Sequence, residues 1–102
     1  MRPVCVGPLV DAIGARLIRG ERNLPLDRLA APHDAGERDV CVVFDRHHRR
    51  AVERRKVTLV VLPDALVEDG PLEAVSVAAV EHPRLAFARA TRWWALPPPP
   101  PG

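Results

Sequence analysis

The stretch "VCVVFDRHHRRAVERRKVTLVVL", residues 40–62, decides the fold. It begins with Val40–Phe44, five apolar residues rich in β-branched side chains, which are too short for a helix and predict a buried strand. Asp45 then stands where an N-cap residue would start a helix over the basic segment. A second apolar run, Val57–Leu62, predicts a second buried strand. Strand, helix and strand in so short a span make a compact βαβ unit, and such continuous apolar strands belong in a sheet covered on both faces.

The segments on either side extend this unit. A third apolar run, "AVSVAAV" at Ala74–Val80, predicts another buried strand. Between the N-terminus and the first buried strand, two short extended segments are expected around the turn at Gly20, followed by the loop "PHDAGERD". A short amphipathic helix is expected to begin near Pro8. Its apolar face is predicted to consist of Leu9, Val10, Ile13 and Leu17.

A last helix is predicted to begin at Pro83, because proline suits the first turn of a helix. The face that packs on the sheet is expected to consist of Ala86, Phe87, Ala90, Trp93 and Trp94. The prolines Pro97–Pro101 cannot continue this helix and predict a polyproline II tail. The fold class is therefore α/β, a small single domain with a mixed, mostly parallel sheet flanked by helices. Its boundaries are predicted as an N-terminal extension (1–6), the domain (7–94) and a proline-rich tail (95–102).

Length and charge limit the classes of function. A chain of 102 residues supports one core and one domain. The net charge of +2, from 15 basic and 13 acidic side chains, is too balanced to imply a polyanionic partner by itself. No apolar stretch approaches the roughly 18 residues that a membrane-spanning helix needs. We therefore expect a soluble cytoplasmic protein without a membrane span.

Few residues offer metal or catalytic chemistry. Cys5 and Cys41 fit no metal or redox spacing, and we expect both to be buried or incidental thiols. His47 and His48 are adjacent, so they point to different sides of a helix and would not chelate one metal ion. The one serine, Ser76, lies inside a predicted strand. No catalytic residue, metal site or cofactor is expected.

The helix after Asp45 carries a local basic signal. Residues 46–56 contain six basic side chains and one acid. Arg46, Arg50 and Arg54 recur every four residues and would line one side of a helix, where they would make phosphate contacts on a nucleotide or a nucleic-acid backbone. The alternative is the solvated outer face of an α/β layer. No aromatic residue interleaves with these arginines, so sequence-specific nucleic-acid binding is not expected.

Three segments, "VDAIGARLIRGERNLPLDRLAAPHDAGERDVCVVF", "RRKVTLVVL" and "HPRLAFARA", carry a resemblance in their order and spacing. From about Gly7 to Trp94 the chain resembles the N-terminal non-repeat region of bacterial UDP-3-O-acylglucosamine N-acyltransferases, which is similar to Mur ligase N-terminal domains. The resemblance implies a small α/β domain that helps to hold the uridine part of a UDP-sugar during lipid A assembly. It also implies that acyl transfer belongs to a following left-handed β-helix of hexapeptide repeats. This sequence has no hexapeptide period, so we expect a stand-alone domain that is not catalytic alone.

The same resemblance implies a uridine pocket. Its stacking aromatic would fall at Val42, its amide at Asp45 and its second aromatic at His48, and each of these residues departs from the family pattern. A shifted register would instead use Phe44, with His47 and Arg50 in the other two places. Losing a stacking ring removes roughly 1 to 3 kcal/mol of binding free energy. The expected nucleotide binding is therefore weak or lost.

Two alternatives for function stay open. The domain would be a protein-interaction module, docking through its basic helix or its tryptophan end. Otherwise it would be the front part of a split or truncated acyltransferase that works with hexapeptide repeats on a separate chain. If a following module once packed on the tryptophan end, at least one of Trp93 and Trp94 is expected to be partly exposed, which would suit a homo-oligomer or another partner.

Overall fold

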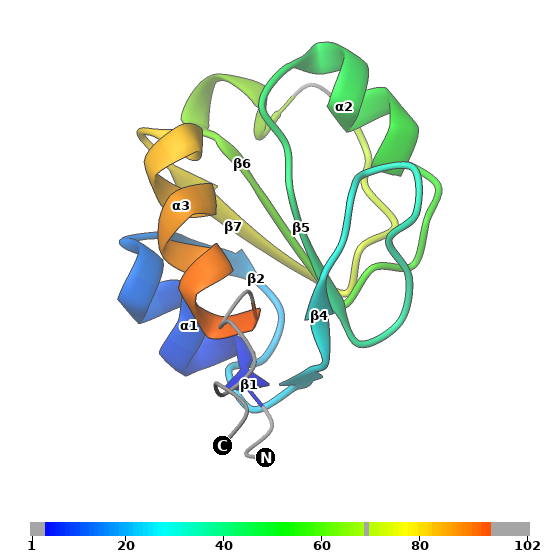
Figure 1. The fold of residues 1–102 in the computed structure, drawn as a ribbon. Coiled ribbons are helices and arrows are strands. Elements are labelled where there is room, and N and C mark those ends of the chain that lie inside the picture. Colours follow the sequence, from blue (N-terminus) through cyan, green and yellow to red (C-terminus); the bar gives the residue numbers. More distant parts are fainter. Residues whose placement is uncertain (1–3, 69, 95–102) are drawn as a thin grey trace, which may run out of the picture.

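The computed structural model describes residues 4–68 and 70–94, so the predicted proline-rich tail lies outside the described residues. A five-stranded sheet, in the order β2-β7-β6-β5-β4, forms the centre of the fold (Figure 1). A separate two-stranded sheet pairs β1 with β3. The strands are β1 (Val4–Cys5), β2 (Arg16–Arg19), β3 (Pro25–Leu26), β4 (Arg28–Leu29), β5 (Asp39–Val42), β6 (Leu59–Pro63) and β7 (Ser76–Val80). The helices are α1 (Val6–Ile13), α2 (Arg46–Val52), α3 (Pro83–Trp94) and the 3-10 turn η1 (Asp64–Leu66).

The sheet is mixed and mostly parallel, as predicted. Strands β4, β5, β6 and β7 pair in parallel, whereas β2 runs antiparallel to β7 at one edge. The βαβ unit is β5-α2-β6, with Val40 opposite Leu59 and Val42 opposite Val61. All three predicted buried strands exist, and their ends lie within two residues of the expected ones. The fold class expected from the sequence is confirmed.

The strand pleat of β5 divides the apolar core into two layers. Val40 and Val42 pack in a cluster with residues of α1 and α3, on the face where Figure 1 shows these two helices side by side. Cys41 and Val43 point to the other face and cluster with Val52 of α2. Burial, reinforced by the charge of Asp39, raises the pKa of the Cys41 thiol to about 12. That thiol is therefore protonated at neutral pH and behaves as a small apolar side chain.

The first helix is shorter than predicted. Its apolar face holds Leu9, Val10 and Ile13, but Leu17 lies in β2 instead. Gly14 ends the helix with a φ of 73°, a left-handed conformation that glycine adopts without strain. The N–H of Ala15 then donates to the Val10 carbonyl oxygen at 2.9 Å, so the chain leaves the helix before Leu17.

The last helix packs on the sheet through a narrower face than predicted. Ala86 and Ala90 are buried, as expected. Phe87 and Trp93 each keep 38% of their surface exposed. The side chain of Trp94 lies outside the described part of the chain. The partial exposure expected at the tryptophan end is therefore present at Trp93, while the oligomer or partner expected there stays a prediction.

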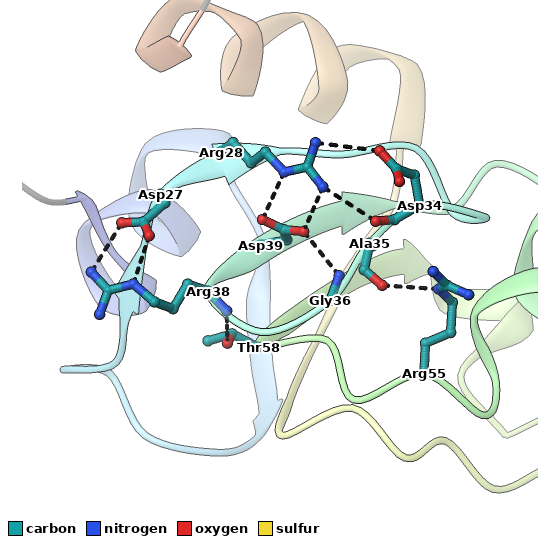
Figure 2. A network of polar contacts seen from close by, with 9 residues as sticks. All are labelled: Asp27, Arg28, Asp34, Ala35, Gly36, Arg38, Asp39, Arg55 and Thr58. Atoms are coloured by element: carbon teal, nitrogen blue, oxygen red, sulfur yellow. Dashed lines mark hydrogen bonds and ion pairs between the residues drawn. The ribbon is translucent and has the colours of Figure 1, made fainter.

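A polar network fixes the loop that leads into β5 (Figure 2). Asp39 is 6% exposed, and its carboxylate accepts hydrogen bonds from Nε of Arg28 at 3.0 Å and from the Gly36 N–H at 2.9 Å. The backbone N–H of Arg38 donates to Oγ1 of Thr58 at 2.7 Å. Because these bonds join β4, the loop and the residue before β6, they set how the edge strand β4 lies beside β5. Within the described residues, no helix is long and apolar enough to cross a membrane.

A buried arginine holds α2 in place. Arg49 is 1% exposed, although the sequence places it in a basic run that we expected to be solvated. Its Nε donates to the Leu66 carbonyl oxygen at 2.8 Å and its Nη2 to the Gly70 carbonyl oxygen at 2.6 Å. Its Nη1 pairs with Oε1 of Glu53 at 2.8 Å. The guanidinium of Arg49 thus attaches α2 to the segment between β6 and β7. The carboxylate of Glu53 balances the positive charge of Arg49.

We expect Arg49→Met to lower the free energy of unfolding by about 2 to 4 kcal/mol, because it leaves buried carbonyl groups and one carboxylate without their donor. Urea unfolding monitored by circular dichroism measures this change. The matched control is Arg50→Met, since the next side chain along α2 is exposed and should change the free energy by less than about 0.5 kcal/mol. Equal stabilities of the two variants would contradict the anchoring role of Arg49.

A second prediction concerns the turn after β2. Gly20 has a φ of 103°, and a Cβ added there would lie 2.7 Å from Cα of Ser76. We expect Gly20→Ala to cost about 2 kcal/mol or more, because both the backbone conformation and the contact with β7 become strained. Gly36→Ala is the control, since a Cβ there meets no atom within 4 Å. Thermal unfolding of both variants measures the difference, and a Gly20→Ala protein as stable as the control would show that this turn tolerates a side chain.

Candidate functional site

A cavity of about 470 Å³ lies at the carboxyl ends of β4 and β5. The segment after β4 forms one wall and includes Ala31 and His33. Phe44 follows β5, and His47 and His48 come from α2. In open parallel sheets this edge is the usual place for a ligand, because the loops that leave the strands diverge there. The topology of the sheet therefore makes this cavity the first candidate for a binding site.

Aromatic rings gather at one side of this cavity. Phe44 meets Phe87 of α3 edge to face, with ring centroids 5.5 Å apart and planes at 64°. Phe44 also meets the imidazole of His48 edge to face, with centroids 5.8 Å apart and planes at 69°. Phe44 is half-buried and Phe87 is more exposed, so both keep ring surface for a ligand. We call Phe44, His48 and Phe87 the aromatic cluster; it offers stacking surface to a planar group.

A second cavity, of about 420 Å³, adjoins the first through the same three rings. The aromatic cluster lines both cavities, and Asp45 and Arg84 complete the second. This second cavity therefore combines aromatic surface with one carboxylate and one guanidinium. A ligand that contains a planar ring and a charged group has chemically matched surfaces here.

Asp45 has a defined charge state. Its Oδ1 accepts a hydrogen bond from the His48 backbone N–H at 2.9 Å, which is the N-cap that the sequence predicts. That bond is the main cause of the lowered pKa of Asp45. Desolvation opposes it, and the imidazoles of His48 and His47, together with the His47 backbone N–H, lower the pKa further. The side chain is 60% exposed. Near neutral pH Asp45 is therefore an ionised carboxylate, which accepts hydrogen bonds and donates none.

The three residues expected at the uridine pocket lie around this cluster. Val42 and His48 line the first cavity, and Asp45 and His48 line the second. Val42, however, is only 2% exposed and packs in the core beneath α1 and α3. Phe44 lies two residues further along the chain and presents its ring at the cavity instead. The aromatic ring at this cavity is therefore that of Phe44, the residue that the shifted register assigns to stacking, and its stacking role stays a prediction.

The other members of the shifted register are only partly brought together. His47 lines the first cavity with Phe44. Arg50 instead lines a separate hollow of about 270 Å³, together with Arg46, Arg49 and Glu53. Neither of the two expected sets of pocket residues lines one cavity as a complete set.

The expected row of three arginines does not form on α2. The helix ends at Val52, so Arg54 lies beyond it. Arg46 and Arg50 line their own hollow and neither of the two aromatic cavities. The expectation that all three arginines share one helical face was wrong, because the basic run is longer than the helix that it forms, while their phosphate contacts stay a prediction.

Sequence reasoning missed His33, Phe87 and Arg84 as residues near a site. Phe87 was expected to pack on the sheet, but it lies at the edge of the helix face that does so. His33 comes from the loop between β4 and β5 and Arg84 from the first turn of α3, and both reach the cavities through tertiary packing. Within residues 4–68 and 70–94, no group of three histidine, cysteine, aspartate or glutamate side chains is arranged to hold a metal ion.

Comparison with models of known protein families gives no match. Among curated proteins, the chain is similar to the UDP-3-O-acylglucosamine N-acyltransferase of Delftia acidovorans, with 30% identity over 91 residues that cover 89% of this chain and 27% of that protein. It is 31% identical over 100 residues to the protein of the same name from Verminephrobacter eiseniae, which covers 95% of this chain and 30% of that protein. The protein of the same name from Acidovorax sp. (strain JS42) is 27% identical over 89 residues. The chain thus spans less than a third of the length of these relatives. By these matches it is homologous to the N-terminal part of the UDP-3-O-acylglucosamine N-acyltransferases.

Proposed function

We propose that this domain holds the nucleoside end of a UDP-sugar at the aromatic cluster, with weak affinity, and that it performs no acyl transfer by itself. The relatives are named for a UDP-linked acylglucosamine substrate, which supports a UDP-sugar as the ligand. The carrying observation is the aromatic cluster at the carboxyl ends of β4 and β5, with Asp45 beside it. The cytoplasmic location expected from the sequence is part of this proposal.

The aromatic cluster supplies the attraction for the base. A uracil ring that stacks on the exposed surface of Phe44 or Phe87 gains roughly 1 to 3 kcal/mol, as bases do on aromatic side chains elsewhere. His33 and His47 add polar groups at the wall of the same cavity. This surface is present even though Val42 is buried and aliphatic, so the domain does not need an aromatic residue at position 42.

Asp45 explains why the affinity is weak. Uracil presents two carbonyl oxygens and one N–H on its pairing edge, so a matching side chain must both donate and accept. The ionised carboxylate of Asp45 accepts only, and it leaves a uracil carbonyl oxygen without a donor. An unmade hydrogen bond of this kind costs on the order of 1 to 3 kcal/mol. The negative charge also repels a diphosphate, so both effects act against binding.

We expect Asp45→Asn to bind UDP about fivefold to tenfold more tightly than the unmodified protein, because an amide restores one donor and removes the charge. The fold should be unaffected, since asparagine caps a helix as well as aspartate does. Titration with UDP, followed by the NMR shifts of residues in the aromatic cluster, measures dissociation constants even in the millimolar range. Asp64→Asn is the control, because it makes the same charge change at η1, away from both aromatic cavities. Equal affinities of the Asp45 variant and the unmodified protein, or tight binding by the unmodified protein, would refute the role of Asp45.

The second part of the proposal is that the chain does not catalyse acyl transfer. Its one serine is fully buried in β7, and the buried thiol of Cys41 is protonated at neutral pH, so neither is a ready nucleophile. We expect the purified 102-residue chain to form no N-acylated product from a UDP-3-O-acylglucosamine and an acyl carrier protein loaded with a 3-hydroxyacyl group. The enzyme from Delftia acidovorans serves as the positive control. Product above the level of a heat-denatured sample would show that this chain is catalytic.

A further inference from the structure

Arg84 lies in the first turn of α3 and lines the second cavity with the aromatic cluster and Asp45. It is the one arginine or lysine among the described residues that line either of the two aromatic cavities. Two of the arginines expected to make phosphate contacts, Arg46 and Arg50, line a hollow that shares none of its described lining residues with these cavities. A ligand whose ring lies on Phe44 would therefore find a permanent positive charge in the guanidinium of Arg84.

The guanidinium of Arg84 is available for an external anion. No hydrogen bond or ion pair of its side chain is found within residues 4–68 and 70–94. Some other exposed arginines are engaged: Arg16 pairs with Asp64 at 3.0 Å, and Arg38 pairs with Asp27 at 2.6 Å. Arg89, one helix turn further along α3, donates to the Ile13 carbonyl oxygen. Among the residues that the structure describes, the charge of Arg84 thus has no partner.

Asp45 lines the same cavity but does not neutralise Arg84. No ion pair joins the two side chains in the described part of the chain. The lowered pKa of Asp45 comes from the backbone N–H of His48 and from the imidazoles of His48 and His47, and Arg84 is not among its causes. The second cavity therefore holds two opposite charges that are separated, with the aromatic cluster beside both.

We propose that Arg84 is the residue that binds the phosphate of a nucleotide whose base lies on the aromatic cluster. This inference rests on the proposed function and names the part of the ligand that the second cavity takes. A guanidinium presents several N–H donors in a planar fork that matches phosphate oxygens, and such charge-assisted hydrogen bonds are stronger than neutral ones. Base and phosphate lie in adjoining cavities, as the two ends of one nucleotide require. The arginines of α2 take no part in this contact.

The test compares uridine with UDP on three proteins: the unmodified chain, Arg84→Gln and Arg50→Gln. Both substituted arginines are exposed and lie on helices, so Arg50→Gln is a matched control for the loss of one positive charge. NMR titration gives the dissociation constants, and the unperturbed part of each spectrum shows that the fold is retained. An Arg84→Lys variant is added, because it keeps the charge and loses the planar fork.

We expect the unmodified protein to bind UDP more tightly than uridine. Arg84→Gln should lower UDP affinity about fivefold, the effect of one partly screened charge-assisted contact, and leave uridine affinity unchanged. Arg84→Lys should recover part of the loss, and Arg50→Gln should match the unmodified protein with both ligands. If UDP shifts the aromatic cluster but Arg84→Gln binds it as well as the unmodified protein, the assignment of Arg84 is overturned and the proposed function stands. If neither ligand shifts the aromatic cluster, even in Asp45→Asn, the proposed function and this inference are both overturned.

Discussion

The side chain of Arg49 is the constraint on which the position of α2 depends. This helix has seven residues, and Val52 is its one buried apolar side chain. A single valine buries too little surface to hold a helix on a sheet, since full burial of such a side chain contributes about 1.5 to 3 kcal/mol. The Arg49 guanidinium supplies further attachment through its hydrogen bonds to the carbonyl oxygens of Leu66 and Gly70, while its pair with Glu53 lies at the end of α2 itself. The helix is thus held by polar contacts where most α/β layers use apolar ones.

The orientation of α2 in turn decides which of its side chains line the cavity beside β4 and β5 and which line the separate hollow. With Arg49 turned into the protein, His47 and His48 face the cavity at the carboxyl ends of β4 and β5. Arg46 and Arg50 then lie at a different hollow, which they share with Arg49 itself. A helix rotated so that Arg49 pointed to solvent would move the imidazoles away from Phe44. The anchoring contact therefore maintains the aromatic cluster, although it touches none of the three rings.

The sequence predicted the sheet better than it predicted the site, for physical reasons. The strands β5, β6 and β7 are continuous apolar runs because both of their faces are covered, and that pattern is visible without any tertiary information. The cap at Asp45 is equally local. The burial of Arg49 has no local signal, because its partners lie 17 and 21 residues away and are carbonyl groups, which every residue has. Arg84 and Phe87 reach the cavities only because α3 packs beside β4 and β5, and hydrophobic periodicity does not encode that placement.

Asp45 serves two roles that respond differently to substitution. As a cap it needs only an oxygen that accepts the His48 N–H, and aspartate and asparagine supply one equally well. At the cavity the two side chains differ, because aspartate brings a negative charge and only accepts hydrogen bonds, whereas asparagine is neutral and also donates them. The codons for these amino acids differ by one nucleotide. A lineage can therefore exchange one for the other without passing through a less stable protein, so the charge and hydrogen-bonding character of this cavity are free to drift, or to be selected, while the fold stays the same.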